Sequence, residues 1–549
     1  SDLPRRLNRI ILTLPTATSV QEQAIIRSRA ESALRLVWAT QGIKESDSGI
    51  SRRPELIVEW DEASCTELVY LYSELTQKFD GRIEDFLRLK GKLRTRPERG
   101  APEPSLRLAC IDIGGGTTDL MVTTYMGEQN RMLLPEQTFR EGFRVAGDDL
   151  VKRVVAAIVI PRIEASIQAA GGRFVGEKLR ELFGGDVGGQ DQRSVQLRRQ
   201  FTLRTLVPLA ISLLEYCESA DEFEVFNLRA QEVLGLAPSV DSEGEAPQTP
   251  VEDRFPAELK AYIEGAAADL GAVDWRLTDL TVSASREDVD AISREVFQKV
   301  LGNMGEVIQH LGVDVLLLTG RPSRLPAVRS IIEELMVVPP HRLISMHQYV
   351  TGQWYPFRDP ITQRIGDPKS TVAVGGMLIA LAETRIPNFK VSAEAFRMRS
   401  TARFIGEMDT NEQIPGNRVI FSDLDLDADS GTGQIATVQM FAPMQIGSRQ
   451  LPLERWTTTP LFRLDFANAS AQRRPAPIRV TLERAEFDDD DENQTSENVL
   501  KRESLREAFE ITEVEDGQGD GMKPSDITLR LQTLGFQDEY WLDTGVFQL

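Results

Sequence analysis

The sequence predicts an α/β protein with a helical insertion and a β-rich C-terminal domain. Apolar strand-like runs alternate with helical patterns from the start of the chain to about residue 160. The same alternation returns at about residue 291 and continues to about residue 390. The stretch between these regions is mostly helical, and short β-type runs separated by turns follow after about residue 390.

We divide the 549 residues into four predicted domains. Residues 1–105 form an incomplete first α/β lobe, and residues 391–549 form the β-rich domain. A second α/β lobe is assembled from residues 106–160 and 291–390, because its strand–helix pattern resumes after an interruption. Residues 161–290 are the helical insertion that separates these two segments.

The first lobe contains two apolar strands, each followed by a helical pattern. The strands are expected over 10–14 and 54–60, and the helices over about 20–38 and 64–75. Asp61 and Glu62 precede the second helix, where the helix dipole favours acidic residues. Residues 90–106 are basic and contain prolines, so we expect a loop there.

Two apolar strands enclose a glycine turn between residues 108 and 122, which predicts a β-hairpin. The turn begins with Gly114, Gly115 and Gly116. Glycine has no Cβ and tolerates positive φ, so backbone amides in such a turn can approach an anion closely. These three residues are therefore candidate phosphate-binding residues. The alternative is a plain tight turn with an aspartate at the end of each strand.

The residues beside the turn indicate which anion it holds. Asp112 and Asp119 flank the glycines, and their carboxylates would repel a phosphate unless a divalent cation lay between them. The natural ligand is therefore a magnesium-bound nucleotide, with Asp112 and Asp119 as metal ligands. The hydroxyl of Thr117 is placed to hold a γ-phosphate oxygen or an attacking water.

The pattern Asp-x-Gly-Gly-Gly-Thr-x-Asp resembles the second phosphate motif of the actin/heat-shock-chaperone/sugar-kinase ATPase superfamily. The resemblance implies two actin- or chaperone-like ATPase lobes, ATP and Mg²⁺ as cofactors, and catalytic roles for Asp112, Thr117 and Asp119. The strand–helix order of the first lobe also matches the chaperone, in which Glu62 corresponds to a glutamate near metal-bound water. A helix N-terminal acid without a catalytic role is the other interpretation of Glu62.

Three further elements resemble nucleotide-binding parts of the same superfamily. Residues 146–150 resemble a chaperone element that leads into a helix, and residues 318–326 resemble the adenosine motif. Residues 367–376 resemble its closing helix, Asn-Pro-Asp-Glu-Ala-Val-Ala-x-Gly. A structural strand-to-helix turn is the alternative for 318–326. The implied nucleotide contacts are Gly147, Thr319, Gly320, either Arg321 or Arg324 stacked on the base, and Asp367.

The sequence also departs from this superfamily. A first phosphate motif, Asp-x-Gly with Ser or Thr, should open the first lobe, yet none precedes Arg9, and the catalytic lysine is missing with it. Residues 427–433 are only a poor permuted copy of that motif. Residues 206–212 are uncharged where the chaperone places charges around adenine and ribose. We therefore expect either the C-terminal part of a longer protein or a site that has lost its activity.

Most of the chain resembles the bacterial virulence factor SrfB family. The resemblance rests on residues 9–15, 319–324, 446–456 and 459–461. The block from 446 to 461 is not a chaperone motif, and it separates this family from its better-known relatives. The resemblance implies a virulence-associated protein and adds little about mechanism.

The composition limits the expected partners. A net charge of −21 argues against broad binding to nucleic acids or anionic membranes, because both require a positive surface. No apolar run approaches the roughly 20 residues of a membrane span. The three cysteines have no metal-ligand spacing and imply no disulfides, which favours a cytoplasmic protein. The segments 238–250 and 487–493 are expected to be solvated loops.

These observations favour an ATP-binding protein that acts as a nucleotide-dependent switch or slow ATPase. The β-rich domain is then the expected contact for an unidentified protein partner. The alternative is a non-catalytic interaction or structural protein that retains the fold, which the missing first phosphate motif favours. A sugar kinase or exopolyphosphatase would need a catalytic carboxylate facing a substrate pocket in the first lobe, and the sequence shows no such signature.

Overall fold

The computed structural model describes residues 7–41, 53–95, 100–128, 131–184, 191–235, 255–382, 385–400, 402–411, 413–422, 435–452, 458–484, 509–531, 540–547 and 549. The predicted loops 238–250 and 487–493 and the segment 427–433 lie outside the described residues. The chain divides into two compact units. The first comprises Ser1–Arg144, Asn303–Arg321 and Met336–Gly535, and the second comprises Val145–Gly302, Pro322–Leu335 and Phe536–Leu549. The division into four domains stays a prediction.

The first unit begins with two short parallel strands joined by a helix. These are β1 (Arg9–Ile11), α1 (Val20–Thr40) and β2 (Glu55–Ile57). The next helix, α2 (Glu62–Lys78), is capped by Asp61, whose carboxylate accepts the N–H of Ser64 at 2.8 Å. The predicted order of strand, helix, strand and helix in this region is therefore confirmed.

A mixed sheet of six strands lies at the centre of the first unit. Its strands are β3 (Lys92–Thr95), β4 (Pro102–Ile113), β5 (Thr118–Glu128), β6 (Met132–Phe143), β9 (Val315–Thr319) and β10 (Leu343–Ser345). The order across the sheet is β10, β9, β4, β5, β6, and β3 pairs with the start of β4. The β10–β9 and β9–β4 pairs are parallel, whereas β4, β5 and β6 are antiparallel.

The loop predicted over residues 90–106 is wrong, because β3 and the start of β4 lie within it. Lys92–Thr95 pairs antiparallel with Pro102–Ser105. Proline disfavours a strand interior but is tolerated at the first residue of a strand, which is where Pro102 lies. Antiparallel pairing between these two neighbouring segments thus outweighs the local turn signal.

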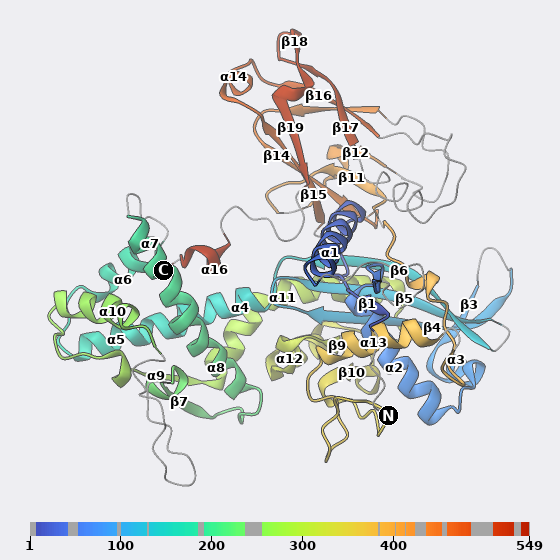
Figure 1. Ribbon diagram of the computed structural model, residues 1–549, viewed down its shortest axis with the longest axis horizontal. Coiled ribbons are helices and arrows are strands. Elements are labelled where there is room, and N and C mark those ends of the chain that lie inside the picture. The colour runs from blue at the N-terminus through green and yellow to red at the C-terminus, as the bar shows by residue number, and fades with distance from the viewer. Residues whose placement is uncertain are drawn as a thin grey trace. The chain divides into compact units, whose positions relative to one another are not determined.

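Helices α2, α3 (Ile83–Lys90) and α13 (Ser370–Ala382) share one apolar core with β4 and β9. Figure 1 shows α13 beside α2. This close approach requires Gly375, because a Cβ there would lie 1.9 Å from the carbonyl oxygen of Cys65. Cys65 and Cys110 are free and buried in this core.

The later part of the first unit is rich in β-structure, as predicted. One sheet has the order β12 (Val419–Phe421), β11 (Phe404–Glu407), β14 (Met444–Arg449), β15 (Thr459–Phe466), β19 (Ile527–Leu531). The other has the order β13 (Ile435–Met440), β16 (Ile478–Arg484), β17 (Phe509–Glu515), β18 (Gly521–Met522), and α14 (Ala469–Gln472) precedes β16. One apolar cluster joins the two sheets, and within it the rings of Phe421 and Phe509 stack 5.0 Å apart.

The second unit is mostly helical and includes the predicted helical insertion. Its helices are α4 (Gly147–Val154), α5 (Ile160–Ala169), α6 (Val175–Phe183), α7 (Gln192–Phe201), α8 (Val207–Cys217), α9 (Ala230–Val233), α10 (Ala257–Asp269), α12 (Pro326–Leu335), α16 (Trp541–Thr544) and most of α11 (Arg286–Leu311). A hairpin of β7 (Val225–Arg229) and β8 (Thr281–Ser285) accompanies them. A π-helical turn precedes Pro161 and another precedes Pro208, since proline cannot donate the regular helical hydrogen bond.

Candidate functional site

The predicted phosphate hairpin is formed by β4 and β5. Its turn comprises residues 114–117, and the N–H of Gly114 donates to the carbonyl of Thr117 at 2.8 Å. Gly115 and Gly116 are exposed, and a Cβ on Gly116 would meet nothing within 4 Å. None of the three glycines has a positive φ, so their contribution is open access to the backbone. Because the Gly114 amide is used inside the turn, Gly115 and Gly116 are the candidates for contacting an anion.

Two buried carboxylates lie at the base of this turn. Asp112 and Asp119 pair directly across the β4–β5 ladder, and the two residues are only 5% and 4% exposed. The Oδ1 atom of each is buried without a hydrogen-bond partner. The Oδ2 atom of Asp119 accepts the N–H of Thr16 at 3.1 Å, a contact that the sequence did not indicate.

Burial controls the charge of this pair. It raises the pKa of Asp112 to about 6, although Lys369 opposes the shift. Burial, together with the neighbouring Asp112 charge, raises the pKa of Asp119 to about 8. The pair therefore carries about one negative charge near neutral pH, because two adjacent buried carboxylates do not ionise together.

Lys369 is a site residue that sequence reasoning missed. Its Nζ lies 3.3 Å from Oε2 of Glu62 and 4.0 Å from Oδ2 of Asp112. Burial alone would lower the pKa of Lys369, but Asp112 and Glu62 raise it above its ordinary value. One feature of the sequence could have identified Lys369 as a site residue. In the closing-helix motif, Lys369 replaces the aspartate that follows the proline. Glu62 is the first residue of α2, so its contact with Lys369 is compatible with either interpretation of that glutamate.

Further acidic residues lie behind the hairpin. The Asp61 carboxylate accepts two hydrogen bonds from Ser64, and burial raises its pKa despite them. The hydroxyl of Tyr125 donates to Glu67 at 2.6 Å, and burial raises the pKa of Glu67 well above its usual range. These groups support the hairpin from within the core and are not accessible to a ligand.

The predicted adenosine motif begins beside the hairpin. Thr319 on β9 pairs with Asp112 on β4, so Asp112 lies between Thr319 and Asp119 across three strands. Gly320 has φ +86°, and a Cβ there would lie 2.0 Å from the carbonyl oxygen of Ile113. The neighbouring strand β4 therefore occupies the space that a Cβ would need, and the fold requires glycine at position 320 whether or not a nucleotide binds. Arg321 begins a 3₁₀ turn directly after it.

The remaining predicted contacts are distributed over both units. Asp367 accepts the N–H of Lys369 at 3.0 Å, so its carboxylate organises the start of α13. Gly147 and Arg324 belong to the second unit. Gly147 is the first residue of α4, the helix into which the predicted element 146–150 leads. Arg324 pairs with Glu218 at 2.8 Å inside that unit. The nucleotide contacts of these residues stay predictions.

The carboxylate pair fits Mg²⁺ only in part. Two hard oxygens without hydrogen-bond partners suit this ion, which usually takes one or two carboxylates and completes its shell with phosphate oxygens and water. Within the described residues, no group of three or more His, Cys, Asp or Glu side chains is placed to hold a metal. Asp112 and Asp119 could therefore hold Mg²⁺ that arrives with a nucleotide, and they do not form a complete protein site.

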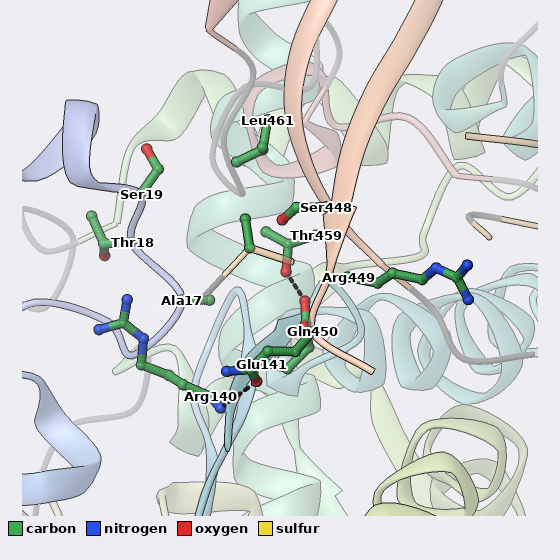
Figure 2. A pocket seen from close by; sticks show the side chains of 11 residues that line it. Ala17, Thr18, Ser19, Arg140, Glu141, Ser448, Arg449, Gln450, Thr459 and Leu461 are labelled. Carbon is green, nitrogen blue, oxygen red and sulfur yellow. Dashed lines mark hydrogen bonds between the residues drawn. The ribbon is translucent and has the colours of Figure 1, made fainter. Parts of the chain in front are cut away.

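A small cavity lies beside β6, next to the hairpin strands (Figure 2). Arg140 and Glu141 of β6 line it together with the loop Ala17–Ser19 and with residues of the β-rich domain. The N–H of Arg140 donates to the side chain of Gln450 at 3.0 Å, and the hydroxyl of Thr459 donates to Glu141. The cavity measures about 20 Å³, room for about one water molecule. The block predicted to distinguish the family therefore contacts the strand next to Asp119.

Comparison with protein families gives a match for this chain. No curated protein matches the chain, and none of its described helices is both long and apolar enough to cross a bilayer. One family model covers nearly the whole chain, and its description associates the family with virulence. Because that match extends over residues 1–548, the chain belongs to the family described as virulence factor SrfB.

Proposed function

We propose that this protein binds Mg²⁺-ATP at the β4–β5 hairpin and acts as a nucleotide-dependent switch or slow ATPase. One observation carries the proposal: Asp112 and Asp119 are buried opposite each other below an exposed glycine turn, each with an oxygen that has no hydrogen-bond partner. A buried polar atom without a partner costs about 1–3 kcal/mol, and adjacent carboxylates add repulsion. An arrangement that opposes stability in this way is typical of a binding site.

Different residues of the hairpin would contact the phosphates and the metal ion. The N–H groups of Gly115 and Gly116 are on the exposed part of the turn and would donate to phosphate oxygens. Asp112 and Asp119 would hold Mg²⁺, which neutralises phosphate charge when bound. The hydroxyl of Thr117 would hold a γ-phosphate oxygen or a water, and Glu62 would orient that water. The buried Asp119 must release its proton before both carboxylates can serve as ligands.

A specific observation favours the second candidate, a non-catalytic interaction protein. Lys369 already pairs with Glu62 and Asp112 and compensates one of their charges, and the β-rich domain contacts β6 through Thr459 and Gln450. A protein that keeps this fold only to bind other proteins would keep the Lys369 ion pairs and the β6 contacts, and it would need no metal. In either case we propose that the β-rich domain contacts a protein partner. The family description supports a role of this interaction in virulence.

Calorimetric titration with Mg²⁺-ATP separates the two candidates. We expect the wild-type protein to bind ATP, and we expect Asp112→Asn and Asp119→Asn each to weaken binding at least tenfold. Asp520→Asn removes an exposed carboxylate of the β-rich domain and should bind like the wild type. Absence of heat with the wild type, or equal affinity in all four proteins, would reject the nucleotide site and favour the interaction protein.

A further inference from the structure

We infer that Lys369 is the resident cation of the carboxylate site. Its ammonium group takes the place beside Asp112 that a divalent cation would otherwise fill, so the free protein excludes metal from this site. The inference rests on the proposed function for what the site is used for, but its test does not depend on nucleotide.

The position of the ammonium group is the first support. Its Nζ lies 3.3 Å from Glu62 and 4.0 Å from Asp112, and so it bridges α2 and β4. Among the ion pairs of the described residues, Lys369 is the cation that reaches these two acids. The side chain is 47% exposed, so solvent reaches it.

The backbone that carries Lys369 is held in place. Asp367 accepts the N–H of Lys369 at 3.0 Å, and the hydroxyls of Thr371 and Thr66 lie 2.9 Å apart, which joins α13 to α2. The packing of Gly375 against Cys65 fixes the same pair of helices. The backbone of Lys369 is therefore held at the start of α13, and protein contacts alone keep α13 in place.

Electrostatics explains the exclusion. A divalent cation bound to Asp112 would lie close to the ammonium group in a partly buried site, where repulsion between like charges is stronger than in water. The acids that face the site are Glu62, Asp112 and Asp119, and Lys369 already compensates one of their charges. Phosphate groups bring additional negative charge, so metal should enter together with a nucleotide.

The test measures Mn²⁺ binding without nucleotide, by the loss of the free-ion electron paramagnetic resonance signal. We expect Lys369→Met to bind Mn²⁺ at least tenfold more tightly than the wild type, because the competing charge is gone and the carboxylates remain. Lys369→Arg keeps the charge and should behave like the wild type. The double variant Lys369→Met with Asp112→Asn should lose the gained site.

Two results would overturn the inference: tight Mn²⁺ binding by the wild type, or no gain in Lys369→Met. Lys369→Gln repeats the measurement, and its thermal unfolding midpoint checks that the fold is intact. Calorimetry with ATP is run separately, with Mg²⁺ and with EDTA. If the wild type never binds ATP, the proposed function fails, while the Mn²⁺ result still decides the role of Lys369. If ATP binds but Mn²⁺ shows no difference between Lys369→Met and the wild type, the inference fails alone.

Discussion

Asp119→Asn should stabilise the protein while it weakens nucleotide binding at least tenfold. In the folded chain the pKa of Asp119 is raised to about 8 from an ordinary 3.8, with burial as the main cause and Asp112 as the second. The folded state therefore binds a proton that the unfolded state has released over this range. The stability that this proton contributes is fully present below pH 3.8 and is lost as the pH rises toward 8.

The structure sets the size of the effect. At pH 7 the ionised Asp119 of the unfolded chain lies about 3 pH units above its ordinary pKa, and each unit corresponds to about 1.4 kcal/mol. The upper limit for the lost stability is therefore about 4 kcal/mol, shared with Asp112 because the two groups titrate together. Asparagine keeps an oxygen for the N–H of Thr16 and places no charge beside Asp112. Most of the penalty should disappear in the variant.

Differential scanning calorimetry between pH 5 and pH 8 measures this prediction. The wild-type unfolding midpoint should fall as the pH rises, and the midpoint of Asp119→Asn should depend less on pH and be higher at pH 8. Asp520→Asn should follow the wild type. A variant that is less stable than the wild type at pH 8, or equally dependent on pH, would refute the reasoning that the buried Asp119 carboxylate destabilises the fold.

Three further substitutions separate binding from packing. Gly116→Ala should change the free energy of unfolding by less than about 0.5 kcal/mol, because its Cβ meets nothing within 4 Å, yet weaken ATP binding in calorimetry by covering the turn amides. Gly320→Ala should destabilise by about 2–6 kcal/mol, because φ is +86° and the Cβ would meet the carbonyl of Ile113 at 2.0 Å; an unchanged melting temperature would contradict this. Thr459→Val should lower the free energy of unfolding in urea by about 1–3 kcal/mol, because the buried Glu141 loses its donor. Thr437→Val, at an exposed threonine pair, is its matched control.

The local part of the site could be predicted from the sequence. Apolar periodicity and the glycine run define the hairpin, because both signals lie within about 15 consecutive residues. The pairing of Asp112 with Asp119 follows from the length of the turn. The same reasoning predicted the position of α2 to within a few residues.

Long-range contacts could not be predicted in this way. Lys369 reaches Glu62 across 307 residues of sequence, and Thr16 reaches Asp119 across 103. The C-terminal residues pack in the second unit, where Asp543 pairs with Arg199. Neither periodicity nor composition carries information about such pairs. The loop predicted over 90–106 failed for a different reason. Its two paired segments are close in sequence, but their basic and proline-containing composition does not indicate that β3 and the start of β4 pair through their backbone groups.

The phosphate hairpin and the family-specific block around Thr459 are far apart in the sequence, yet both lie close to the cavity beside β6. Thr16 donates to Asp119 and directly precedes Ala17, which lines the cavity. On β6, Gly142 pairs with Asp119 and directly follows Glu141, the partner of Thr459. Asp119 is thus linked to the family-specific block along two short backbone paths. Because 318 residues separate Glu141 from Thr459, only the fold shows that this block belongs to the surroundings of the candidate site and is not an independent module.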